Sequence, residues 1–212
     1  MIEFNVKGDD RMKDGTVIVI SRQYGSGGRE LAHILSRKLG LHLYDRQLIH
    51  IAAAKIGIDD MKEGDLKQLE EEIPPLSLKF MPFYIFGMQG EKPLNNKMFE
   101  AESEAIRQLA KDGSCIILGR CADYVLKNFP EAYSFYVCAD DAYRTQRGKT
   151  VYDGKSLREL KDEDRKRGQY YTYYTGNMWG DPSNYTASIN TSRITLEKGA
   201  DLIINYIETL QK

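Results

Sequence analysis

The stretch that decides the expected fold is Thr16-Val17-Ile18-Val19-Ile20-Ser21-Arg22-Gln23-Tyr24-Gly25-Ser26-Gly27-Gly28-Arg29-Glu30. Its apolar start predicts a buried strand, and apolar residues at helical spacing follow its glycines. Glycines let successive backbone N–H groups turn toward one point, and the start of a helix adds its positive end. The stretch therefore predicts a phosphate-binding loop between a strand and a helix, made of Arg22, Tyr24, Gly25, Ser26, Gly27, Gly28, Arg29 and Glu30.

This loop departs from the P-loop pattern, which ends Gly-Lys-Ser/Thr. In one register Arg29 replaces the lysine and Glu30 the hydroxyl residue, and in the other Gly28 stands at the lysine position. Arg29 is the candidate for the missing charge, because a guanidinium can bind phosphate oxygens through two N–H groups. Glu30 is a candidate magnesium ligand, although a glutamate in a first helical turn also stabilises the helix dipole. A glycine turn that only packs a strand against a helix is the alternative.

Composition narrows the function classes. The chain has 212 residues, 30 of them basic and 31 acidic, with a net charge of -1. This length fits one domain, and the balanced charge argues for a small anionic ligand rather than a nucleic acid. Cys115, Cys121 and Cys138 have no metal-site spacing and are expected to be reduced thiols. The sequence contains no secretion signal and no membrane-spanning run, so a cytoplasmic location is expected.

Strands and helices alternate along most of the chain. After the first strand and a helix that ends before Gly40, strand candidates are residues 41–44, 114–118, 133–138 and 185–190. Helical patterns cover residues 46–56, 98–111 and 196–210. This alternation predicts an α/β fold, with a parallel sheet covered by helices on both faces. The core of this single domain is expected at residues 16–58, 98–140 and 182–212.

Two stretches interrupt the alternation. Residues 59–97 contain the aromatic run Phe80 to Phe86, which could cover a ligand, mediate a homodimer or pack into the core. Residues 141–181 are dense in charge and follow a strand end, where open parallel sheets bind ligands. This second stretch is interpreted as a lid whose arginines, beyond those paired with carboxylates, bind the transferred phosphate; a solvated helix is the alternative. The lid arginines are Arg144, Arg147, Arg158, Arg165 and Arg167.

Three separated segments resemble one protein family. They are residues 20–30 with Tyr44-Asp45-Arg46, then Ile117-Leu118-Gly119-Arg120-Cys121-Ala122-Asp123, and finally Tyr170-Tyr171-Thr172-Tyr173-Tyr174-Thr175-Gly176 followed by Tyr185 and Asn190-Thr191-Ser192. In these segments the chain resembles the cytidylate kinase-like family, relatives of bacterial cytidylate kinases among the P-loop nucleoside monophosphate kinases. The resemblance extends over nearly the whole sequence.

The resemblance implies a three-layer P-loop fold with a five-stranded parallel sheet, an acceptor-binding insertion at about residues 59–97 and a lid at about residues 141–181. It implies a kinase that transfers a phosphoryl group from ATP, with Mg²⁺, to a nucleoside monophosphate or a similar small acceptor. A non-catalytic nucleotide-binding protein with a degenerate loop is the alternative. Cys121 stands where cytidylate kinases carry an aspartate, so base specificity stays open. The implied acceptor-binding residues are Tyr44, Asp45, Arg46, Gly119 and Arg120; for Asp45 and Arg46 the start of a helix is an equal alternative.

Overall fold

The computed structural model describes residues 12–45, 47–58, 62 and 94–212. Contacts divide the chain into two compact units, one formed by Met1–Asp45 with Ile106–Lys212 and the other by Arg46–Ala105. The first unit contains the whole sheet and all but one of the candidate site residues, Arg46 being the exception. The predicted insertion, residues 59–97, lies largely outside the described residues, and the aromatic run at 80–86 lies wholly outside them.

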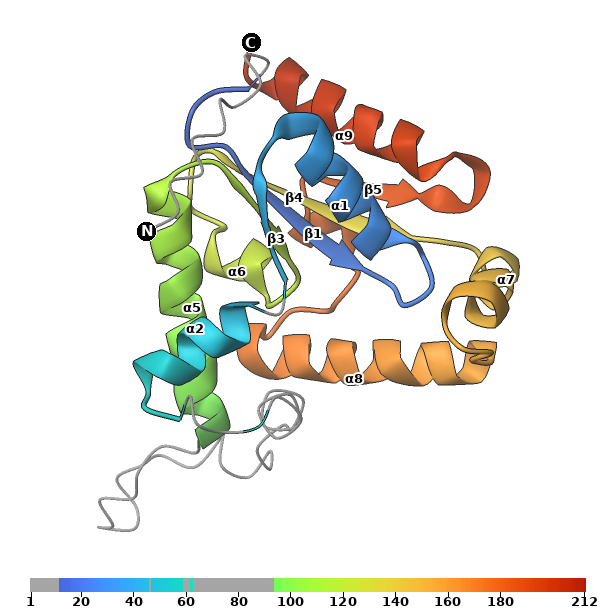
Figure 1. Ribbon diagram of the computed structural model, residues 1–212, viewed down its shortest axis with the longest axis horizontal. Coiled ribbons are helices and arrows are strands. Elements are labelled where there is room, and N and C mark those ends of the chain that lie inside the picture. The colour runs from blue at the N-terminus through green and yellow to red at the C-terminus, as the bar shows by residue number, and fades with distance from the viewer. Residues whose placement is uncertain (1–11, 46, 59–61, 63–93) are drawn as a thin grey trace. The chain divides into compact units, whose positions relative to one another are not determined.

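Five strands form one parallel sheet in the first unit (Figure 1). They are β1 (Val17–Arg22), β2 (His42–Tyr44), β3 (Cys115–Leu118), β4 (Ala132–Cys138) and β5 (Ala187–Asn190). Their order in the sheet is β2-β3-β1-β4-β5, so β1 is central and pairs with β3 on one side and β4 on the other. This order confirms the predicted parallel sheet, and it brings the chain segments that follow β1, β3 and β4 to the same edge.

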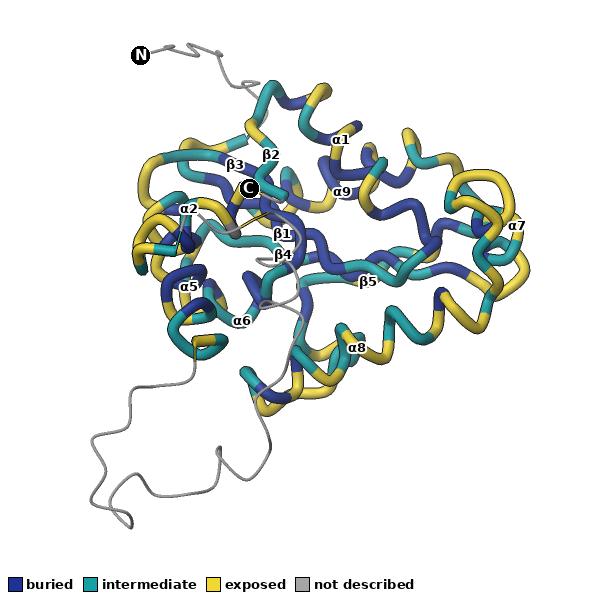
Figure 2. The backbone as a smooth tube through the Cα atoms, turned by 60° about the horizontal axis from the view of Figure 1, so that its bottom comes forward, coloured by how far each residue is buried: buried dark blue, intermediate teal, exposed yellow. Residues whose placement is uncertain are grey.

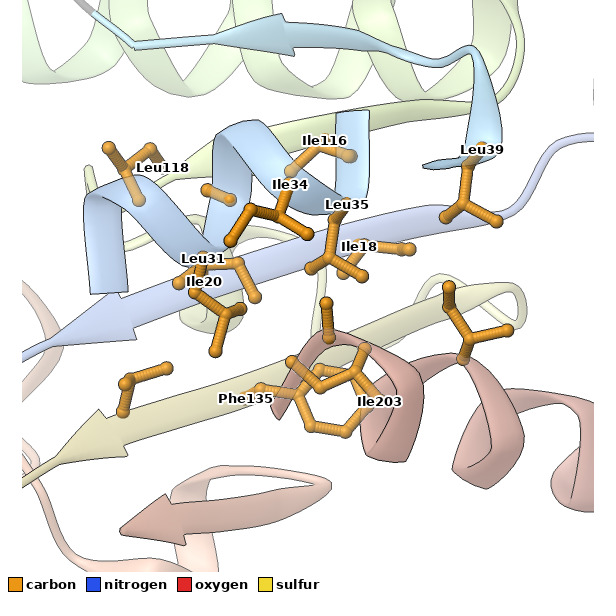
Figure 3. Packing of buried hydrophobic residues seen from close by; sticks show 14 of the residues in the cluster. Ile18, Ile20, Leu31, Ile34, Leu35, Leu39, Ile116, Leu118, Phe135 and Ile203 are labelled. Atoms are coloured by element: carbon orange, nitrogen blue, oxygen red, sulfur yellow. The ribbon is translucent and has the colours of Figure 1, made fainter. Parts of the chain in front are cut away.

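Helices α1 (Gly28–Leu39) and α9 (Leu196–Leu210) pack together on one face of the sheet. Leu31 and Leu35 of α1 lie against Ile18 and Ile20 of β1, with Ile203 of α9 beside them (Figure 3). All five side chains are fully buried, and each such burial stabilises the fold by about 1.5 to 3 kcal/mol. Helix α1 ends at Gly40, whose φ of 63° is the left-handed conformation expected of a glycine cap.

The opposite face of the sheet is covered by α6 (Ala122–Val125) and by the end of α8 (Leu157–Thr175). The buried Tyr171 of α8 donates a hydrogen bond of 2.6 Å from its hydroxyl to Asp123 of α6. Beyond α8, the rings of Trp179 and Tyr185 pack against Tyr136 of β4. The central strands β1 and β3 are therefore buried between helical layers, whereas the edge strands β2 and β5 are partly exposed. Helix α8 alternates between buried and exposed residues (Figure 2), and this arrangement confirms the three-layer α/β fold.

The second unit contains α2 (Gln47–Lys55) and the first part of α5 (Leu94–Asp112). Ala52, Ala53, Met98 and Ala101 form its small apolar core. Two predicted boundaries are wrong. Helix α5 begins at Leu94 rather than at residue 98, inside the predicted insertion. Strand β5 begins at Ala187 rather than at residue 185, because Tyr185 ends a 3-10 turn by donating its backbone N–H to Pro182.

Candidate active site

The glycine-rich loop between β1 and α1 is held in one conformation by buried hydroxyl groups. Gly25 and Gly27 have φ values of 83° and 81°, which side chains rarely allow. Ser26 is fully buried and donates from its hydroxyl to the carbonyl of Gln23 at 2.8 Å. Thr191, which follows β5, donates in turn to the carbonyl of Ser26 at 2.7 Å. The loop is thus held by a hydrogen bond within itself and by one from the residue that follows β5.

Several backbone N–H groups of this loop are available to an acceptor. Among the described residues, no hydrogen-bond acceptor is found for the N–H groups of Gly25, Gly27, Arg29 and Glu30. The last two belong to the first turn of α1, where unpaired N–H groups and the helix dipole favour an anion. The loop has the backbone geometry required to bind phosphate.

Three arginine side chains converge beside this loop. Arg22 ends β1, Arg120 follows β3 and Arg167 lies on α8. Burial, reinforced by the charges of Arg167 and Arg120, lowers the pKa of Arg22 to about 9. Burial also lowers the pKa of Arg120, to about 10. Both groups stay charged at neutral pH, so the carboxyl ends of β1 and β3 carry concentrated positive charge.

The chain after β3 has an unusual backbone. Gly119, Arg120 and Cys121 are all left-handed, with φ values of 78°, 61° and 52°. Such conformations cost a non-glycine residue of order 1 kcal/mol or more and persist only where the surroundings hold them. A Cβ atom at Gly119 would lie 2.2 Å from Nη1 of Arg22, so a larger residue there would displace the end of this guanidinium. This strained turn therefore brings the backbone of β3 directly against the Arg22 guanidinium.

Helices α7 (Asp141–Val151) and α8 pack on the loop rather than forming a separate body. Arg144 is 3% exposed and donates from Nε to the carbonyl of Tyr24 at 2.9 Å, while its Nη2 pairs with Asp164. Asp164 also accepts the backbone N–H of Tyr24 at 2.7 Å. Arg167 donates to the carbonyl of Arg22 at 3.2 Å and lies over the ring of Tyr24. Side chains of α7 and α8, which belong to the predicted lid, thus hold residues 22–24 in place.

Four of the five lid arginines have carboxylate partners, so the predicted surplus is reduced to Arg158 among the described residues. Arg144 and Arg167 share Asp164, Arg147 pairs with Glu30, and Arg165 pairs with Asp162 three residues earlier. Arg158 is exposed, and no carboxylate lies within ion-pair distance of it in the part of the chain described. Glu30 reaches Arg147 from α1, 117 residues away along the chain, so the partner of this arginine does not follow from the charges of its own segment.

Arg29 and the predicted acceptor residues occupy the edge near β2. Arg29 is 51% exposed and pairs with Asp45 at 2.9 Å, so its guanidinium is bound at the end of β2 rather than inside the loop. Tyr44 precedes Asp45 at the same strand end, and burial raises the pKa of its hydroxyl. Gly119 and Arg120 follow the neighbouring strand β3. Arg46 lies outside the described residues.

Glu30, the candidate magnesium ligand from the sequence, lies in the first turn of α1. Its Oε1 accepts a hydrogen bond from Arg147, while its buried Oε2 has no partner. Mg²⁺ needs few protein ligands where phosphates and water complete its shell. No group of three or more His, Cys, Asp or Glu side chains suited to a metal is present in the described parts.

Two contributors to the site were missed from the sequence. Thr191 was quoted only as part of the segment Asn190-Thr191-Ser192, and its hydroxyl proves to hold the loop. Asp164 is one of several carboxylates on α8, and it accepts the loop N–H of Tyr24, 140 residues away. A buried threonine directly after a strand was the one available signal for the first, and no sequence signal marked the second.

Comparison with known proteins identifies the family. A model of the cytidylate kinase-like family matches residues 17–193. The chain belongs to this family. Among solved structures, an uncharacterized protein from Eubacterium ventriosum is similar at 23% identity with a TM-score of 0.66, covering 92% of this chain and 99% of that one. No match was found among curated proteins.

Two kinases share the fold at lower similarity. Shikimate kinase from Bacteroides thetaiotaomicron has 14% identity and a TM-score of 0.54, and the match covers 92% of this chain and 99% of that one. A sugar kinase from Janibacter sp. has 14% identity and a TM-score of 0.51, with 91% and 94% covered. The cytidylate kinase-like protein thus has a P-loop kinase fold. No helix within the described ranges has the length and apolar character to cross a membrane.

Proposed function

We propose that this cytidylate kinase-like protein transfers a phosphoryl group from ATP to a nucleoside monophosphate or a similar small acceptor. The observation that carries the proposal is the convergence of Arg22, Arg120 and Arg167 beside a loop whose N–H groups lack acceptors. Transfer of a phosphoryl group needs donor and acceptor held in line and the charge on the phosphoryl oxygens neutralised. Guanidinium groups and backbone dipoles meet this need without a nucleophilic side chain.

The roles of the residues follow from their positions. The N–H groups of Gly25, Gly27, Arg29 and Glu30 bind the phosphates of ATP. Arg167 spans from α8 to the end of β1. Arg120, Gly119, Tyr44 and Asp45 follow the two strands on the other side of β1 and bind the acceptor. Magnesium, held by Glu30 and the phosphates, supplies additional neutralising charge when bound.

Residues 141–181 act as a lid in this proposal. Closure of α7 and α8 over the loop excludes water and protects ATP from wasteful hydrolysis. The contacts of Arg144, Arg167 and Asp164 with residues 22–24 are those that such a closed state requires. The charge of Arg167 then reaches the phosphate only while the lid is in place.

The test compares wild type with two matched variants. Thermal shift with ATP, ADP and nucleoside monophosphates, with and without Mg²⁺, measures binding, since a ligand of the folded state raises the melting temperature. Arg167→Gln should weaken ATP binding by about tenfold to a hundredfold, the value of a charge-assisted hydrogen bond. Arg165→Gln, on the same helix but paired with Asp162, should leave binding unchanged. Equal ATP binding by all three proteins would contradict the assigned role of Arg167.

A second function is favoured by one observation. Both the lysine and the Ser/Thr of the P-loop pattern are replaced, as expected of a protein that binds nucleotide without catalysis. A coupled assay for ADP release distinguishes the two proposals. ADP formation that depends on a monophosphate acceptor supports the kinase, whereas ATP binding without turnover, with every acceptor tried, supports the regulatory protein.

A further inference from the structure

The structure distinguishes between the two registers of the P-loop pattern. In the pattern Gly-x-x-x-x-Gly-Lys-Ser/Thr the second glycine ends the loop and the helix follows at once. Here Gly27 is the left-handed residue before the helix, and α1 begins at Gly28. Gly27 therefore matches the second glycine of the pattern, Gly28 the lysine, and Arg22 the first glycine.

Positions 22 and 28 exclude side chains from one another. A Cβ atom added to Gly28 would lie 2.5 Å from Cβ and 3.1 Å from Cγ of Arg22. Carbon atoms that are not bonded cannot approach so closely, because their optimal separation is about 3.5 to 4.0 Å. With this backbone, one of the two residues must be glycine. In the usual pattern glycine comes first and the cation later, and in this chain the order is reversed.

The side chain of Arg22 leads back into the site. It passes Gly28 at the start of α1, and its Nη1 lies close to the backbone of Gly119 after β3. The charges of Arg167 and Arg120 are near enough to lower its pKa, and that of Asp45 is near enough to raise it. Within residues 12–45, 47–58, 62 and 94–212, no carboxylate lies within ion-pair distance of Arg22. A half-buried guanidinium that has two other arginines nearby and forms no ion pair of its own is stabilised by an anion.

We infer that Arg22 supplies the charge that a P-loop lysine normally supplies, and that glycine and cation have exchanged positions 22 and 28 in this loop. The anion bound is the phosphate chain of a nucleoside triphosphate, so the inference rests on the proposed function. It replaces the sequence-based assignment of that role to Arg29, whose guanidinium is paired with Asp45 at the end of β2.

The test is to place glycine at position 22 and lysine at position 28, as in the usual P-loop pattern. Four proteins are compared: wild type, Arg22→Gly, Gly28→Lys, and the double variant Arg22→Gly with Gly28→Lys. Affinity for ATP, and for inorganic tripolyphosphate as a probe without a base, is measured by titration calorimetry. Arg22→Gly should weaken both by about tenfold to a hundredfold. The double variant should regain most of the loss, because the lysine now has both its usual position and the space that Arg22 left.

The single variants separate the effect of lost charge from the effect of altered packing. Gly28→Lys alone should lower the melting temperature and should not bind more tightly than wild type, because its Cβ would meet Arg22. Arg22→Gln keeps Cβ and Cγ against Gly28 while removing the charge, so it separates loss of charge from loss of packing. It should weaken ATP binding as much as Arg22→Gly does, with a melting temperature near that of wild type.

Each outcome bears on a distinct statement. If wild type binds ATP and Arg22→Gln binds it equally well, the assignment to Arg22 is wrong and the proposed function stands. If the double variant binds no better than Arg22→Gly, the positional exchange is wrong. If wild type binds neither ATP nor tripolyphosphate, the proposed function fails and the inference fails with it.

Discussion

Arg144 and Arg165 belong to the same charged segment, and each pairs with an aspartate, yet their surroundings differ completely. Arg144 is 3% exposed and joins Asp164 to the backbone of Tyr24. Arg165 is 67% exposed, and its partner Asp162 lies three residues earlier on the same helix. The first pair connects α7 and α8 to the glycine-rich loop, whereas the second joins two residues on the surface of α8.

The difference shows what burial does to an ion pair. An exposed pair contributes about 0 to 1 kcal/mol, because water solvates each charge almost as well as its partner does. A buried pair need not stabilise more, but breaking it leaves an uncompensated charge in a poorly solvated place. Removal of one arginine should therefore have large consequences at position 144 and small ones at position 165.

Arg144→Ala is expected to have the largest effect. It leaves the carboxylate of Asp164 buried without its main cation, and it removes the bond to the carbonyl of Tyr24. The free energy of unfolding should fall by about 3 to 5 kcal/mol, measured by urea denaturation near neutral pH. A loss below about 1 kcal/mol would mean that Arg167, 3.8 Å from Asp164, compensates for Arg144.

Asp123 can be compared with these pairs, because its buried carboxyl group forms no ion pair within the described part of the chain. Asp123 is 7% exposed and accepts a hydrogen bond from the hydroxyl of Tyr171. Burial raises the pKa of Asp123 to about 6, although the Tyr171 hydrogen bond opposes the shift. Because the unfolded value is about 3.9, the folded protein binds the extra proton between these two pH values. This carboxyl group therefore lowers stability progressively as the pH rises from about 4 to about 6.

Asp123→Asn should remove this pH dependence. The amide oxygen can still accept the hydrogen bond from Tyr171, and the amide carries no charge to desolvate. At pH 7 the variant should exceed wild type in free energy of unfolding by about 2 to 3 kcal/mol, and the difference should vanish near pH 4. Urea denaturation of both proteins at several pH values measures this. A difference that is constant with pH would show that Asp123 titrates normally.

The smallest effect is expected from the outward-facing arginines. Arg158 and Arg165 are both exposed, and replacing both with alanine removes surface charge and one exposed ion pair. The free energy of unfolding should change by less than about 0.5 kcal/mol per site. The melting-temperature shift produced by ATP should match that of wild type. A smaller shift would show that these side chains reach the phosphate and that the inward and outward groups do not differ in function.

Much of the fold was predictable because its signals are local. The apolar run of β1, the glycines after it and the helical spacing of Leu31, Ile34 and Leu35 give strand, loop and helix in order. The parallel sheet followed from repetition of this pattern. Strand and helix ends were less predictable, as at Leu94 and Tyr185, since neighbouring turns and packing decide them.

Within the candidate site, residue types were more predictable than partners. The sequence placed Arg22 among the phosphate-binding residues but gave the lysine role to Arg29. Distance along the chain does not reveal that a Cβ atom at Gly28 would collide with Arg22, or that Asp45 binds Arg29. Asp164 likewise reaches Tyr24 only because α8 folds back across the end of β1.

The sequence by itself determined the layered α/β architecture and a glycine-rich loop at the start of α1, because period and glycine content act within a few residues of one another. Tertiary structure alone decided which arginines are buried and paired, and which cation lies beside the loop. The strength of a charge interaction depends on the distance between the two groups and on their solvation, and the two groups can lie on segments far apart in the sequence. The spatial order of the strands sets those quantities, and the order of the residues does not.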